Sequence, residues 1–243
     1  MRIALLAPLV SPIAPPFLGG AQALLADLAS GLALRGHAVT LYAADGSAVS
    51  GVETPVLGID SSLLTPARMA GSLSRPGDRE KGAGTEHLDG SEDDDELADG
   101  LVPGGLDAYL SDYAFLRAYR AIAEHAGEHD LVHAHAYDAP AFAYSSLQPL
   151  PVLHTLHLPD QDAGVRAMLA MIAPASGAAS RTRLVTVSSA CAATYRPFCR
   201  IDQVIYNGIP IEQIPYASSP VEESYLLYAG RISPEKGVED AFE

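Results

Sequence analysis

The feature that most limits the possible folds of this chain is its alternation of short apolar runs with stretches of helical periodicity. The apolar runs are Arg2–Ala7, Ala38–Ala43, Asp130–His135, Pro151–His157, Arg183–Ser188 and Gln203–Tyr206. Runs of strand length without regular polar alternation are typical of strands covered on both faces, as in parallel sheets. Because helical stretches separate them, the sequence predicts an α/β fold, here a doubly wound, Rossmann-like parallel sheet.

The first 43 residues show the repeating unit most clearly. Gly19-Gly20 follows the first apolar run, and alanines and leucines then recur at helical spacing over residues 21–32. Arg35-Gly36 supplies a basic last turn and a glycine cap, which are common signals of a helix end. With the second apolar run behind it, this segment reads as a strand–helix–strand unit.

The same pattern continues along the chain with further elements. Helices are expected at 107–126, from about residue 138, and at 161–172, and a short strand is expected at Thr54–Ile59. The side chains of Tyr109, Tyr113, Leu116 and Tyr119 fall on one side of the 107–126 helix.

The net charge of −15 is concentrated in one segment. Asp78–Asp99 holds ten acidic and two basic residues, a net charge of −8, and it is rich in glycine. Such a segment buries too little apolar surface to order itself, so we expect a solvated, mobile insertion at about 76–104. An acidic interaction segment is the alternative. The overall negative charge argues against nucleic acid as a partner, since phosphates would be repelled.

The sequence also indicates a compartment. Cys191 and Cys199 form neither a disulfide framework nor a metal-ligand set, and they read as reduced thiols. The apolar N-terminus mimics a signal peptide, but prolines from Pro8 to Pro16 interrupt it. The sequence offers no apolar stretch long enough to cross a membrane. We therefore expect a cytoplasmic protein, with peripheral membrane association left open.

Candidate site residues follow the predicted strands, whose carboxyl ends bind ligands in folds of this class. Gly19-Gly20 opens a helix, where backbone N–H groups favour an anion. Neither a G-x-G-x-x-G nor a P-loop motif is present. His133 and His135 close one run, and His154 and His157 close the next. Alternation directs the first two to one face and the second two to opposite faces. Hydrogen bonding to a polar ligand, a zinc site and purely structural roles all remain open.

Several motifs in order resemble one enzyme family. The loop "GGAQ", the strand ends "HAHAYDAP" and "LHTLH", and the segments "VIYNGIP" and "AGRISPEKG" are similar to those of the family-4 glycosyltransferases. The resemblance implies the GT-B architecture, in which two Rossmann-like domains face a cleft.

This resemblance also implies a domain organisation. Residues 1–217 would form the N-terminal, acceptor-side domain, and 218–243 the linker with the first strand, at 225–229, and loop of a nucleotide-sugar-binding domain. The family's paired-glutamate segment has no counterpart here. We therefore expect the chain to be inactive alone and to associate with another chain or with the missing half.

The implied chemistry is transfer of a sugar, of hexosyl type, from a UDP- or GDP-sugar with retained anomeric configuration and without a metal or other cofactor. Gly19, Gly20, Arg231 and Lys236 would bind the donor diphosphate, and His135 and His157 would contact the sugar or the acceptor. The acceptor is not specified by the sequence. Two other classes stay open, namely a nucleotide-cofactor oxidoreductase and a non-catalytic or split-enzyme partner module.

Overall fold

The computed structural model describes residues 1–17, 19–64, 105–174, 181–216, 227–230, 237–239 and 241–242, with side chains in the 105–124 helix from residue 109 onward. The chain divides into two units, Met1–Ile209 and Pro210–Glu243. The acidic insertion predicted at about 76–104 lies outside the described residues. No described helix is long and apolar enough to span a membrane.

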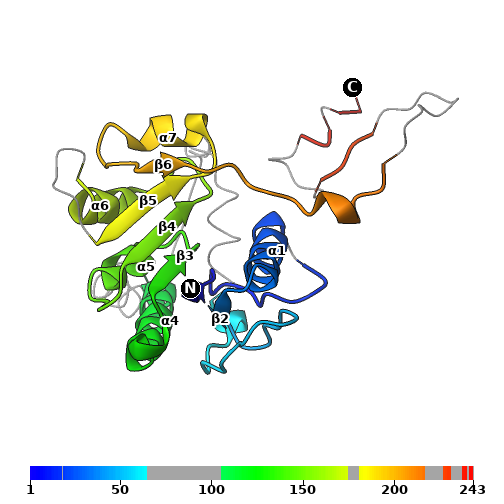
Figure 1. Ribbon diagram of the computed structural model, residues 1–243. Coiled ribbons are helices and arrows are strands. Elements are labelled where there is room, and N and C mark those ends of the chain that lie inside the picture. Colours follow the sequence, from blue (N-terminus) through cyan, green and yellow to red (C-terminus); the bar gives the residue numbers. More distant parts are fainter. Residues whose placement is uncertain are drawn as a thin grey trace, which may run out of the picture. The chain divides into compact units, whose positions relative to one another are not determined.

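The first unit is built on a six-stranded parallel sheet, with strand order β2-β1-β3-β4-β5-β6 (Figure 1). The strands are β1 (Arg2–Leu6), β2 (Ala38–Tyr42), β3 (Leu131–Ala134), β4 (Val152–Leu156), β5 (Thr182–Thr186) and β6 (Gln203–Val204). The chain starts in the interior at β1, moves out to β2, and then returns past β1 to β3. The order therefore reverses between β1 and β3, and such a switch point is where open α/β sheets bind ligands. The predicted α/β, Rossmann-like class is confirmed.

The described helices lie on both faces of this sheet (Figure 1). They are α1 (Gly20–Leu34), α4 (Gly105–Glu124), α5 (Ala139–Ser145), α6 (Ala163–Ile172) and α7 (Ser189–Tyr195), with short 3-10 turns at η1 (Ser61–Leu63), η2 (Ala126–Glu128) and η3 (Ile211–Gln213).

The two faces can be assigned from the core. Leu5 and Leu41 pack with Leu25 of α1 in one buried cluster. The alternate strand residue Leu6 packs with Phe115 of α4 in another. Successive residues of a strand point to opposite faces, so α1 covers one face of β1 and β2, and α4 the other. Around β4 and β5, α5, α6 and α7 supply a third cluster, which contains Phe142, Leu156, Val165, Leu169, Leu184, Cys191 and Tyr195.

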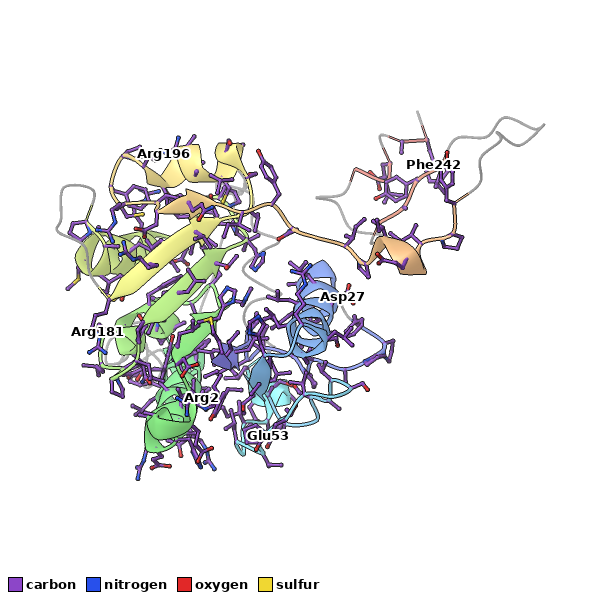
Figure 2. The ribbon with its side chains drawn as sticks, viewed as in Figure 1. Arg2, Asp27, Glu53, Arg181, Arg196 and Phe242 are labelled. Carbon is purple, nitrogen blue, oxygen red and sulfur yellow. The ribbon has the colours of Figure 1, made fainter. Side chains whose placement is uncertain are left out.

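The amino ends of the strands are tied by charged side chains. Arg2 binds the Asp130 carboxylate through Nη2 at 2.6 Å and Nε at 3.1 Å, which joins the starts of β1 and β3. Arg181, before β5, donates to the Pro149 carbonyl. Figure 2 labels both arginines at this edge of the sheet. These cations have structural partners, so the edge opposite them is the candidate for ligand binding.

The strand predicted at Thr54–Ile59 does not form. Only Glu53 makes an isolated bridge to Thr40. Pro55 has no N–H for a ladder, and the amides of Leu57 and Gly58 donate to Asp45 Oδ1 instead of to a strand. Gly58 also has a φ of 65°, in the left-handed region that strands do not use. Leu57 and Ile59 reach the core from a loop, whereas Val56 is exposed.

Two helical features differ from the sequence pattern. The α7 helix was not predicted, although Ser188 caps it by accepting from the Cys191 amide at 3.0 Å. On α4, the side carrying Tyr109, Tyr113 and Leu116 is exposed, with only Tyr119 of that set in the core. The helix buries Phe115, Ala118 and Ile122 instead. Because α4 has apolar residues on two sides, its packing against the sheet, and not its periodicity, determines which side is buried.

In the second unit, the strand predicted at 225–229 is not formed over residues 227–229, and residues 225 and 226 lie outside the described part. Leu227 is 78% exposed. A strand is held by hydrogen bonds to a neighbour, and no neighbouring strand lies among the described residues of this unit.

Candidate functional site at the strand switch point

The candidate site lies where β1 and β3 end side by side. The His135 amide donates to the Leu6 carbonyl at 2.9 Å, so the pairing of β3 with β1 continues to residue 135. The glycine loop follows β1 and His135 follows β3. The predicted glycines and this histidine therefore belong to the same carboxyl edge, at the point where the strand order reverses.

The histidines of β3 face the same side of the sheet as α1. His133 is in register with Leu5, which packs against α1. Because neighbouring residues in register point to the same face, His133 and, two residues on, His135 share the α1 face.

The second histidine pair is divided between the faces, as alternation predicts. In β4, His154 is in register with Ala134 and lies on the opposite face, against the Phe142 ring at 4.7 Å between centroids. Thr155 and His157 lie on the α1 face, because they contact His133 and His135.

These contacts form a continuous array of four side chains. His133 Nε2 lies 2.8 Å from Thr155 Oγ1, and His135 Nδ1 lies 2.8 Å from His157 Nε2. The ring centroids are 4.2 Å apart between His133 and His135, and 5.1 Å apart between His135 and His157. The sequence identified the histidines, but the bonds between them and the part of Thr155 come from the register of β3 and β4.

Burial makes this array neutral. It lowers the pKa of His133 to about 4, and it lowers the pKa of His135 and of His157 as well. Nearby imidazoles act in the same direction on His133 and His135, since each would repel a second positive charge. Neutral imidazoles recognise ligands by directed hydrogen bonds, so the array suits polar contacts to a substrate.

His154 plays a structural part. It is fully buried, and neither of its ring nitrogens has a hydrogen-bond partner among the described residues. Burial lowers its pKa to about 3. Because it points away from the other three histidines, the four do not form one cluster. Within the described part of the chain, no group of three or more His, Cys, Asp or Glu residues is arranged to hold a metal ion.

The glycine pair opens α1 without a side-chain cap. Gly19 is the N-cap in an extended conformation, with φ −167°, and Gly20 is the first helical residue. The loop before it is anchored by Gln22, which donates to Ser11 Oγ at 2.6 Å. A Cβ at Gly20 would have no atom within 4 Å, whereas one at Gly19 would lie 3.2 Å from Gln22 Oε1. The described residues therefore leave room for a side chain at Gly20, the first residue of α1.

The loop that carries His157 is fixed by α7. The Leu158 carbonyl accepts from Tyr195 Oη at 2.7 Å and from Cys191 Sγ at 3.1 Å. The Asp160 amide donates to Thr194 Oγ1 at 3.0 Å. Sequence reasoning missed these residues because it did not predict α7. They hold the backbone next to His157 and therefore help to set the position of its ring.

The predicted cationic residues Arg231 and Lys236 lie outside the described residues. Of the predicted site, the structure therefore places only the glycines and histidines, at the carboxyl ends of neighbouring strands.

Comparison with known proteins identifies the family. The model of Glycosyltransferase Family 4 matches residues 18–213, a span that includes the glycine loop, the histidine array and α7. The search of curated proteins gives no match. Since the family model covers most of the sequence and the fold agrees with it, the chain belongs to glycosyltransferase family 4 and carries that family's glycosyltransferase domain.

Proposed function

We propose that this glycosyltransferase moves a hexosyl group from a UDP- or GDP-sugar to an acceptor with retention of anomeric configuration, and without a metal ion or cofactor. The observation that carries the proposal is that a neutral histidine array and the uncapped start of α1 both follow strand ends at the switch point of the sheet. The backbone N–H groups at Gly19 and Gly20 suit an anionic diphosphate. The pair of His135 and His157 suits the hydroxyl groups of a sugar or acceptor, with His157 the more exposed of the two rings.

The second part of the proposal concerns residues 218–243. We assign them to the nucleotide-sugar-binding domain of such an enzyme, with Arg231 and Lys236 against the diphosphate. The demanding step is the departure of that diphosphate, on which negative charge develops. A guanidinium fork and an ammonium group placed beside it stabilise the charge by electrostatics, with no covalent intermediate.

Transfer can be tested with UDP- and GDP-hexoses and a panel of lipid, saccharide and thiol-precursor acceptors. We expect transfer when residues 1–243 are combined with a complete nucleotide-sugar-binding domain. The anomeric configuration of the product, read by NMR from couplings at the anomeric centre, should be the same as that of the donor. An inverted product would contradict the proposed stereochemistry, and no transfer in any combination would favour a non-catalytic partner module.

Substitution of Gly20 tests the anion site directly. We expect Gly20→Val to leave the fold intact, because a Cβ there meets nothing within 4 Å, and to weaken UDP or GDP binding at least tenfold by covering the start of α1. Gly31→Val, in the same helix and equally unobstructed, is the matched control. The measurement is calorimetric titration of both variants, with circular dichroism for the fold. Equal affinities would make the glycine pair a plain turn.

A further inference from the structure

In the hydrogen bond between His135 and His157, which ring donates determines which nitrogen atoms of the pair carry protons. The bond joins His135 Nδ1 to His157 Nε2 at 2.8 Å. Between two neutral imidazoles, one nitrogen must donate and the other must accept. Each direction also fixes the protonation of the two remaining nitrogens, His135 Nε2 and His157 Nδ1. The pair therefore has two arrangements, which differ in what each ring offers to its surroundings.

Burial of His135 selects one arrangement. The residue is only 6% exposed, and its Nε2 atom is buried with no hydrogen-bond partner among the described residues. Among buried backbone groups, an N–H without an acceptor is rarer than a carbonyl lacking a donor, and we apply the same preference to the imidazole nitrogen. His135 Nε2 is therefore assigned as the unprotonated nitrogen, and the proton of the neutral ring lies on Nδ1. His135 then donates to His157 Nε2, and the proton of His157 must lie on Nδ1.

The ring of His157 is the accessible member of the pair. It is partly exposed, whereas His135 is buried. Its backbone is held by the contacts of Leu158 and Asp160 with α7, and its Nε2 atom is occupied by His135. The remaining nitrogen, Nδ1, would then meet a ligand with a proton already on it. Such a group donates a hydrogen bond, and it has no lone pair with which to act as a base.

We propose that His135 is a positioning residue that holds His157 in the Nδ1–H tautomer, so that His157 donates a hydrogen bond to an oxygen atom of the bound substrate. This inference deepens the proposed function and rests on it for the identity of the substrate. Phosphate and hydroxyl oxygens share the required acceptor chemistry. The other two members of the array, His133 and Thr155, help to hold His135 in place, because the His133 ring packs on the His135 ring.

The tautomers can be read from the 243-residue chain without any enzyme assay. In protein labelled with 15N-histidine, long-range 1H–15N correlation spectra distinguish protonated from unprotonated ring nitrogens. At pH 7 we expect protonated Nδ1 and unprotonated Nε2 in both His135 and His157. In His135→Phe, the His157 ring should lose this fixed state, while the exposed control His125→Gln should leave it unchanged. Protonated Nε2 in both rings of the unaltered protein would be enough to overturn the proposal.

Two substitutions of His157 test the donor. The amide nitrogen of asparagine can take the place of Nδ1, and that of glutamine the place of Nε2. We expect the affinity for the UDP- or GDP-hexose, which offers both phosphate and hydroxyl oxygens, to fall about tenfold in His157→Gln, the scale of one hydrogen bond, and less in His157→Asn. Equal losses would overturn the donor role.

Titration of the labelled protein with UDP, GDP and free hexoses shows which oxygen is the acceptor, because only the true ligand class shifts the His157 Nδ1–H signal. If none of them binds even when a complete nucleotide-sugar-binding domain is added, the proposed function fails, while the tautomer assignment is still decided by the spectra.

Discussion

The free energy of unfolding should fall steeply as the pH is lowered from about 6.5 to 4. His154 is fully buried and His133 is partly buried in the folded protein, and desolvation lowers the pKa of His133 to about 4 and that of His154 to about 3. In the unfolded chain their pKa values are near 6.5. In this window the unfolded state therefore binds more protons than the folded state, so stability is present at neutral pH and lost toward acid.

The expected loss is large. Each histidine that stays neutral in the fold contributes about 1.4 kcal/mol per pH unit below its unfolded pKa. His133 and His154 together amount to roughly 5 kcal/mol between pH 6 and pH 4, on the scale of the whole stability of many domains. His135 and His157, whose pKa values are also lowered by burial, add to it. Urea unfolding at several pH values measures the slope.

Variants can separate the contributions. His154→Leu removes a buried ring whose two nitrogens have no hydrogen-bond partner among the described residues. This variant should therefore be at least as stable as the unaltered protein at pH 7, and its pH slope should be smaller by about one proton. His125→Gln is the control. His125 is exposed, and its hydrogen bond to the Ala121 carbonyl raises its pKa. Its contribution to stability is therefore present at acid pH and lost as the pH rises, the opposite of the buried histidines. A stability that stays constant from pH 7 to pH 4.5 would show that the histidines are not buried as described.

Turnover is expected to fall about 10²-fold or more when Lys236 is changed to Ala in an enzyme that carries the complete second domain. This is the scale for loss of one preorganised group that stabilises developing charge. Lys236 lies outside the described residues, so its assignment comes from the segment "AGRISPEKG" alone. The measurement is kcat with a UDP- or GDP-sugar, since an interaction made mainly in the transition state lowers kcat more than it raises KM.

The chain provides a matched control for this test. Lys81→Ala removes the same charge from the acidic segment and should leave turnover unchanged. Arg231→Lys keeps the charge but loses the bidentate fork, so the turnover of this variant should lie between those of Lys236→Ala and Lys81→Ala. Equal turnover of Lys236→Ala and Lys81→Ala would remove Lys236 from the diphosphate site.

The strands of the sheet could be predicted because their signal is local. An apolar run of strand length such as "RIALLA" or "RLVTVS" must be buried wherever it is placed, and its alternation with helices permits few arrangements. The run at Thr54–Ile59 is also apolar, but Pro55 and Gly58 interrupt it and Asp45 takes two of its amides. That competing hydrogen-bond acceptor lies outside the run and cannot be read from it.

The fold class, the family, the shared face of His133 and His135 and the opposite faces of His154 and His157 could be predicted from the sequence, because strand periodicity and motif order are properties of the chain. The tertiary structure decided what those histidines do. Only the register of β3 with β4 brings His133 to Thr155 and allows His135 to meet His157. Only burial makes the array neutral and leaves His135 Nε2 without a described partner. Hydrogen bonding and desolvation depend on distances between residues that are far apart in sequence, so a motif can name the groups of a site but not their protonation or direction.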